Sequence, residues 1–167
     1  MTIEPLPAED IPQVARLLRD CFEWLSDRNG FTPAQRGFLC GERSSEQTVR
    51  TELQSRPHLV ARREGEILGF VAVHRNNIAR LYIHPRFHRQ GVGRALFDAA
   101  EALIRQAGHD RVTVGALVED AAAFYRAMGM TEIGREVYEP EIFLGREVVL
   151  LAKPLQPGGA SPGASRG

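Results

Sequence analysis

The sequence predicts an α/β (α+β) fold, and two observations carry this prediction. Residues 58–84 form three successive runs rich in β-branched and aromatic side chains, separated by short turns, which is typical of an antiparallel meander. Residues 81–107 then change from a strand, through a basic turn, into a long amphipathic helix. A helical pattern before these stretches and further strands after them indicate a sheet that is covered by helices.

The chain of 167 residues is expected to form one domain over residues 1–155, followed by a disordered tail over 156–167 that has little apolar content. Its net charge is zero, which gives no support to a nucleic-acid or membrane-surface partner. The absence of a signal-peptide pattern and of a long apolar run favours a cytoplasmic location. Cys21 and Cys40 lack metal-ligand spacing and are expected to be reduced thiols.

In the N-terminal third, a strand is predicted at residues 2–6 and helices are predicted at residues 11–25 and 46–55. A loop is predicted between the helices, at residues 28–41. Asp10 stands where it can cap the first helix, and Ser45 precedes the second, weaker one. Apolar residues from Ile11 to Leu25 recur at helical spacing. The irregular, aromatic region from Phe22 to Gly41 is consistent with either a substrate-side flap or a connecting loop.

A phosphate-binding site is predicted where the strand at Leu81 to Ile83 gives way to the long helix. Pro85 has no N–H to donate and ends the strand. Gly91-Val92-Gly93 opens the helix, whose first N–H groups are unpaired and whose dipole is positive at this end. Glycines allow a bound group to approach the backbone closely, so the pattern indicates a nucleotide-like cofactor.

The second half of the chain adds further elements in a regular order. A strand, a short helix and two final strands are expected at residues 111–117, 121–128, 131–138 and 146–151. Asp120 is placed to cap the short helix, and Gly129 is placed to stop it.

Two motifs in this framework resemble those of the GNAT superfamily of acyl-CoA-dependent N-acetyltransferases. The pyrophosphate loop of that family, Q/R-x-x-G-x-G/A, corresponds to residues 88–93, with His88 in place of the usual Gln or Arg. The family segment A-x-x-F-Y-x-x-x-G-F corresponds to residues 121–130, with Met130 in place of the aromatic residue. A Rossmann site is not expected, because Leu96 stands where its third glycine belongs.

The resemblance extends from about Ile3 to Leu155 and implies a fold and a cofactor. It implies a central mixed, mostly antiparallel sheet that is splayed at the fourth strand and has helices on both faces. It implies acetyl-CoA as co-substrate, with the pantetheine arm along the fourth strand and the pyrophosphate on the loop. The implied cofactor-binding residues are Leu81, Tyr82, Ile83, His88, Arg89, Gln90, Gly91, Val92, Gly93 and Arg94.

The implied reaction moves an acetyl group from acetyl-CoA to a primary amine by direct attack through a tetrahedral intermediate, whose oxyanion a backbone N–H would stabilise. Tyr125 is the candidate general acid, and the alternative is that it only packs beside Phe124. The general base is open. Asn77 aligns with a glutamate of other family members, which leaves His74, Tyr82, a water chain or no base at all.

No metal is expected, because His84 and His88 straddle a turn and lack a third ligand. The candidate acceptor-side residues are Phe22, Glu23, Trp24, Asp27, Tyr138, Glu139, Glu141 and Phe143. Their carboxylates favour a cationic acceptor, either a small-molecule amine or a peptide amine. Two alternatives stay open, namely a degenerate domain that binds acyl-CoA as a sensor or structural module, and an enzyme for another acyl donor. Homodimer and monomer are both compatible with the sequence.

Overall fold

The computed structural model describes residues 1–156 and confirms the predicted α/β fold class. The predicted tail lies outside the described residues, apart from Gln156. The strands and the α-helices, in chain order, are β1 (Thr2–Pro5), α1 (Ile11–Asn29), α2 (Pro33–Cys40), α3 (Glu46–Leu53), β2 (His58–Arg63), β3 (Glu66–His74), β4 (Asn77–Ile83), α4 (Val92–Gln106), β5 (Arg111–Ala116), α5 (Glu119–Ala127), β6 (Thr131–Val137) and β7 (Glu147–Pro154). None of the helices within residues 1–156 has the length and apolar character needed to cross a membrane.

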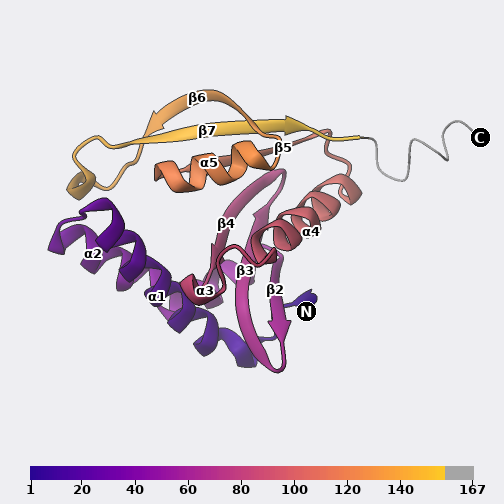
Figure 1. Cartoon of the computed structure of the whole chain (residues 1–167), viewed down its shortest axis with the longest axis horizontal. Helices are drawn as coiled ribbons and strands as arrows, with labels where there is room; N and C mark the ends of the chain where they lie inside the picture. Colours follow the sequence, from indigo (N-terminus) through magenta and orange to yellow (C-terminus); the bar gives the residue numbers. More distant parts are fainter. Residues whose placement is uncertain (157–167) are drawn as a thin grey trace, which may run out of the picture.

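The strands form one seven-stranded sheet in the order β1-β2-β3-β4-β5-β7-β6. Strands β4 and β5 run parallel, and the other neighbours run antiparallel. One face packs against α4 and α5, and the opposite face packs against α1, α2 and α3, so that two apolar clusters form (Figure 1). The mixed, mostly antiparallel sheet with helices on both faces is therefore confirmed.

The sheet opens between β4 and β5. These strands pair at their beginnings, Asn77 with Thr113 and Ile78 with Val114, and then separate (Figure 1). In the ladder between β3 and β4 the register shifts at the same level, which leaves Ala79 as an extra residue on β4. A β-bulge of this kind bends and twists its strand, and the bend directs β4 away from β5.

Helix α2 occupies part of the segment that the sequence predicted to be a loop, and that prediction was wrong. The helix begins with a capping box, in which the Gln35 backbone N–H donates to the Thr32 hydroxyl at 3.2 Å and the Thr32 N–H donates to the Gln35 side chain at 2.9 Å. Thr32-Pro33-Ala34-Gln35 carries the recognised Ser/Thr-x-x-Glu/Gln pattern. Pro33 stands at the first helical position, where proline is a further helix-start signal.

Replacing Thr32 with alanine is expected to lower the free energy of unfolding by about 1 kcal/mol, because one N–H of the first turn of α2 loses its acceptor. Urea denaturation followed by circular dichroism measures the change. Thr51→Ala, at an exposed site within α3, is the control and should stay within about 0.5 kcal/mol of the parent protein. Equal effects of the two substitutions would contradict a capping role for Thr32.

Two predicted aspartate caps have other partners in the structure. Asp10 stands at the N-cap of α1 but makes no capping hydrogen bond, and its carboxylate accepts from Arg62 at 2.6 Å instead. Asp120 lies inside the first turn of α5, whose N-cap residue is Val118, and it forms an ion pair with Arg28 of α1. Both carboxylates therefore connect separate elements.

Lys153, the single lysine of the chain, fixes β7 to α4 and to the end of α5. Its ammonium lies 2.6 Å from the Glu101 carboxylate and donates to the Met128 carbonyl at 3.0 Å. It also lies 5.4 Å from the centre of the Phe97 ring. This one cation is thus held by a carboxylate, a carbonyl and an aromatic face.

Candidate functional site

The backbone of β4 presents hydrogen-bonding groups to the gap beside β5. The His84 N–H donates to the Leu68 carbonyl at 2.9 Å across the β3–β4 ladder. Because bonded and non-bonded pairs alternate in an antiparallel ladder, Tyr82 also bonds to β3, whereas Leu81 and Ile83 direct their N–H and C=O groups outward. Two of the three strand residues predicted to meet the cofactor arm therefore face the gap with their backbone, and Tyr82 does not.

The Ile83 carbonyl in this gap is already held by two side chains. The Cys21 thiol donates to it at 3.4 Å, and His88 Nε2 lies 3.0 Å from it. The Trp24 and His88 rings meet edge to face with centroids 4.9 Å apart. These contacts place Trp24, which was predicted on the acceptor side, beside the first residue of the predicted pyrophosphate loop.

The predicted pyrophosphate loop has the backbone of an anion-binding turn. Arg89 and Gly91 adopt left-handed conformations, with φ of 62° and 84°. Gly91 is the N-cap of α4 and supplies no side-chain acceptor, so the N–H groups of the first turn stay free for a ligand. Gly93 is needed for packing, because a Cβ there would lie 3.0 Å from the Phe124 ring. These exposed donors at the positive end of a 15-residue helix suit a pyrophosphate.

Tyr125 of α5 is buried at the side of the gap that α4 and α5 cover, 6% exposed. Its ring packs against Phe124 and Phe97, at centroid distances of 5.2 Å and 6.3 Å. Burial raises the pKa of the Tyr125 phenol, and the nearby Tyr82 raises it further. The hydroxyl therefore stays protonated throughout the neutral range and is a hydrogen-bond donor there.

The structure places His74 away from the gap, which argues against its predicted role as a base. His74 is exposed at the end of β3 and pairs with Asn77, at the level where β4 and β5 are still joined. It lies three residues beyond Val71, the partner of Leu81, which corresponds to about 10 Å along the strand. The Asn77 side chain accepts from the Thr113 hydroxyl at 2.9 Å and closes this end of the gap.

The two imidazoles considered as metal ligands have other contacts. His84 Nε2 lies 3.0 Å from Asp20, and His84 Nδ1 accepts from the Arg86 N–H at 3.1 Å. His88 Nε2 contacts the Ile83 carbonyl. Residues 1–156 bring together no three His, Cys, Asp or Glu side chains in a way that suits a metal ion.

The predicted acceptor-side aromatic residues gather on the face of the sheet that carries α1, α2 and α3. Phe22 meets the Tyr82 ring edge to face at 5.1 Å, and Phe143 meets Tyr138 at 4.9 Å. Phe143 is held by the turn before β7, whose Ile142 carbonyl accepts from the Gln35 side chain at 2.8 Å. The turn is therefore anchored to α2.

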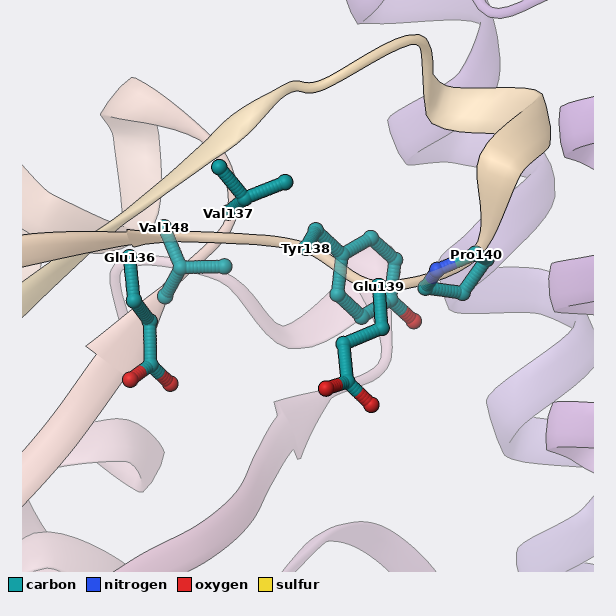
Figure 2. A pocket seen from close by; sticks show the side chains of 6 residues that line it. All are labelled: Glu136, Val137, Tyr138, Glu139, Pro140 and Val148. Atoms are coloured by element: carbon teal, nitrogen blue, oxygen red, sulfur yellow. The ribbon is translucent and has the colours of Figure 1, made fainter.

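The predicted acidic liners divide into two groups. Glu23 and Asp27 both form ion pairs with Arg36, so that their charges are offset. Glu139 lines a pocket of about 650 Å³ together with Glu136, Val137, Tyr138, Pro140 and Val148. The carboxylates of Glu136 and Glu139 point to the same side in this pocket, whereas Val137 points away from them (Figure 2). Glu141 is exposed on the following turn.

Sequence reasoning did not identify Arg80, the charged residue in the middle of β4. Its side chain is buried on the same face as Tyr82, and Arg80 Nε lies 3.1 Å from the Glu52 carboxylate of α3. Arg43, in the short 3-10 turn Glu42–Ser44, contacts the same carboxylate at 3.2 Å. An arginine two residues before Tyr82, within an otherwise apolar strand, was the available signal for this polar cluster.

The two thiols are expected to be inert in the folded protein. Burial raises the pKa of Cys21, and the Asp20 charge adds to the effect. Burial and a hydrogen bond to Glu23 raise the pKa of Cys40 to about 11. At pH 8 this leaves about a hundredfold less Cys40 thiolate than at the ordinary value, so an aromatic disulfide reagent should report two thiols only after denaturation. Rapid reaction of the native protein would contradict this.

Comparison with known proteins gives the family. Residues 31–144 match the family model for the acetyltransferase (GNAT) domain. A GCN5-related N-acetyltransferase from Rhodopseudomonas palustris is 24% identical, with a TM-score of 0.82 over 92% of this chain and 95% of that one. The PaiA N-acetyltransferase from Thermoplasma acidophilum, solved in complex with coenzyme A, is 18% identical, with a TM-score of 0.70 over 92% and 99%. A ribosomal-protein-alanine N-acetyltransferase from Brucella melitensis is 21% identical, with a TM-score of 0.69 over 93% and 100%. The family match covers more than half of the chain, which belongs to the GNAT acetyltransferase family.

Proposed function

We propose that the protein is an N-acetyltransferase that transfers the acetyl group of acetyl-CoA to a primary amine. The observation that carries the proposal is the gap between β4 and β5, where outward backbone groups of Leu81 and Ile83 lead to the uncapped start of α4. An extended, amide-containing arm fits the edge of such a strand, and a pyrophosphate fits the helix end. The coenzyme A complex of the structurally similar PaiA protein supports this choice of cofactor.

The residues that would hold the cofactor are those of β4 and of the loop before α4. The Leu81 N–H and C=O and the Ile83 N–H would bind the arm, since Cys21 and His88 engage the Ile83 carbonyl. The N–H groups from Arg89 to Arg94 would bind the pyrophosphate. When bound, acetyl-CoA supplies an activated thioester carbonyl.

Within the gap, groups of the chain would stabilise the developing negative charge and transfer protons. An outward N–H of β4 would stabilise the negative charge that develops on the carbonyl oxygen as the amine attacks. As the C–S bond breaks, the Tyr125 hydroxyl would give its proton to the departing sulfur. The resulting phenolate, whose raised pKa makes it a strong base, would recover a proton from the new amide nitrogen. Once the ammonium group of the acceptor has lost a proton to solvent, this relay moves one proton from nitrogen to sulfur and leaves Tyr125 unchanged.

The acceptor would enter on the face that carries α1, α2 and α3. The pocket that Glu136, Tyr138 and Glu139 line lies on this face. Tyr138 and Glu136 are two residues apart, so their side chains point to the same side, and Glu136 pairs with Val148 across the hairpin. The carboxylates of Glu136 and Glu139 would attract the ammonium form of an amine as it approaches (Figure 2).

Release of free thiol from acetyl-CoA in the presence of a panel of amines tests the proposal. The panel should include amino acids, polyamines, aminoglycosides and a peptide with a free N-terminus. Amine-dependent release, with the acetylated product identified by mass spectrometry, is the expected result. Tight binding of acetyl-CoA without any release across the panel would favour the alternative of a binding module, and a series of acyl-CoA thioesters would reveal a preference for another donor.

A further inference from the structure

The polar cluster beneath the acceptor face carries an excess of positive charge. Three guanidinium groups surround the single carboxylate of Glu52, with Arg80 at 3.1 Å, Arg43 at 3.2 Å and Arg56 at 3.8 Å. Glu42, in the same turn as Arg43, is exposed, so solvent screens its charge. Within residues 1–156, two positive charges are therefore left without a close counter-ion, beside one buried side chain, Arg80, and two partly exposed ones, Arg43 and Arg56, and an anionic ligand would be stabilising there.

Arg80 in this cluster is buried and incompletely paired. Its side chain is 4% exposed, one Nη donates to the Arg43 carbonyl at 2.9 Å, and the other reaches Glu52 at the long distance of 3.5 Å. Arg80 Nε and Glu52 Oε1 lie 3.1 Å apart and form an ion pair without a well-directed hydrogen bond. Glu52 is also shared with Arg43 and Arg56, so its single charge cannot offset all three guanidinium groups.

The cluster lies beside the reacting end of the gap. Arg80 and Tyr82 share one face of β4, about 7 Å apart along the strand, and the outward backbone of Leu81 lies between them. The Arg43 and Arg80 charges favour the ionised form of both Tyr82 and Tyr138, against the effect of burial, as expected for neighbouring groups. The guanidinium groups and the gap therefore lie close enough for one small molecule with an amine and a carboxylate to reach both.

We propose that the amine acceptor carries a carboxylate, which Arg43 binds beside Tyr138 while Arg80 stabilises it from the buried side. The acceptor class is therefore the amino-carboxylates, of which free amino acids are the simplest. Glu136 and Glu139 would attract the ammonium group and the two arginines would attract the carboxylate, so the charges on this side of the sheet suit a zwitterion. Polyamines and aminoglycosides carry only positive charge and are disfavoured at the arginines. This inference rests on the proposed transferase function.

The test compares L-amino acids with their C-terminal amides, which keep the amine and lose the carboxylate. Isothermal titration of the CoA-saturated protein measures binding, and thiol release from acetyl-CoA measures turnover. The acids should show a Kd at least about tenfold lower than the matching amides and a correspondingly higher kcat/KM, as expected for a hydrogen bond to a charged group. Arg43→Gln should abolish this preference and leave the affinity for CoA unchanged.

Arg56→Gln is the matched control. Arg56 contacts the same Glu52 carboxylate and has a similarly exposed side chain, 31% against 30% for Arg43. It should keep the preference for acids. Equal binding of acids and amides, binding of no acid in the panel, or equal effects of the two substitutions would overturn the carboxylate site. A preference for acids in titration without thiol release would support that site and count against the transferase function.

Discussion

Phenylalanine in place of Tyr125 is expected to lower kcat by about 10²-fold or more while the Kd for acetyl-CoA stays within about twofold. General acid catalysis typically contributes a factor of this size, and the substitution removes only the hydroxyl. The ring contacts with Phe97 and Phe124 remain, so the fold is retained. Single-turnover kinetics measures the chemical step directly, and titration calorimetry measures the affinity for the cofactor.

Tyr82→Phe is the comparison variant for this experiment. Burial raises the pKa of Tyr82 too, but its side chain packs with Phe22 and Phe70 on the opposite face of the sheet. A loss confined to the Tyr125 variant identifies the proton donor. If chemistry limits turnover and the Tyr125 variant keeps its rate, the hydroxyl has no part in proton transfer and its burial is purely structural.

Valine in place of Gly91 is expected to weaken acetyl-CoA binding by at least about tenfold. Gly91 has a φ of 84°, which a β-branched residue adopts only at a cost of about 1 to 3 kcal/mol. No protein atom lies within 4 Å of the position that a Cβ would take. The substitution therefore acts through the shape of the loop and the space left for the ligand, which calorimetric titration with acetyl-CoA measures.

Gly108→Val provides a control just beyond the other end of the same helix. Gly108 follows the C-terminal end of α4, has a φ of 94° and has similarly open surroundings. The two variants should lose comparable stability in thermal denaturation, but only the Gly91 variant should lose cofactor affinity. Comparable losses of affinity would show that the whole helix, and not the loop, determines binding.

The sequence predicted the β2 to β4 meander and the α4 helix closely, because their apolar periodicity and turn residues are local signals. It missed α2, although Thr32 and Gln35 form a local capping-box signal at the start of this helix. It assigned Asp10 and Asp120 as caps, since local spacing does not reveal distant partners such as Arg62 and Arg28. Long-range ion pairs determine the partners of such carboxylates, and these ion pairs form only in the complete fold.

In the candidate site, too, local features could be predicted from the sequence and long-range contacts could not. The loop before α4 is continuous in sequence, so its conformation was predictable from Gly91 and Gly93. The proposed acceptor side is assembled from α1, α2, α3, β4 and the β6–β7 hairpin, and the sequence alone had no way to place Trp24 beside His88 or Arg43 near Tyr138. The bulge at Ala79 determines which face of the sheet the Arg80 side chain lies on, because one extra residue reverses the direction of every later side chain of the strand.

The chemistry of the Lys153 anchor extends to the protein's own reactivity. Guanidinium groups stay protonated and do not compete as nucleophiles for a thioester. Lys153 is the single lysine of the chain, and the remaining lysine-or-arginine positions are all arginine. The one side-chain ammonium, that of Lys153, contacts Glu101, the Met128 carbonyl and the Phe97 ring. A thioester bound in the gap would therefore meet only one lysine amine on the protein, and that amine is already engaged by other groups.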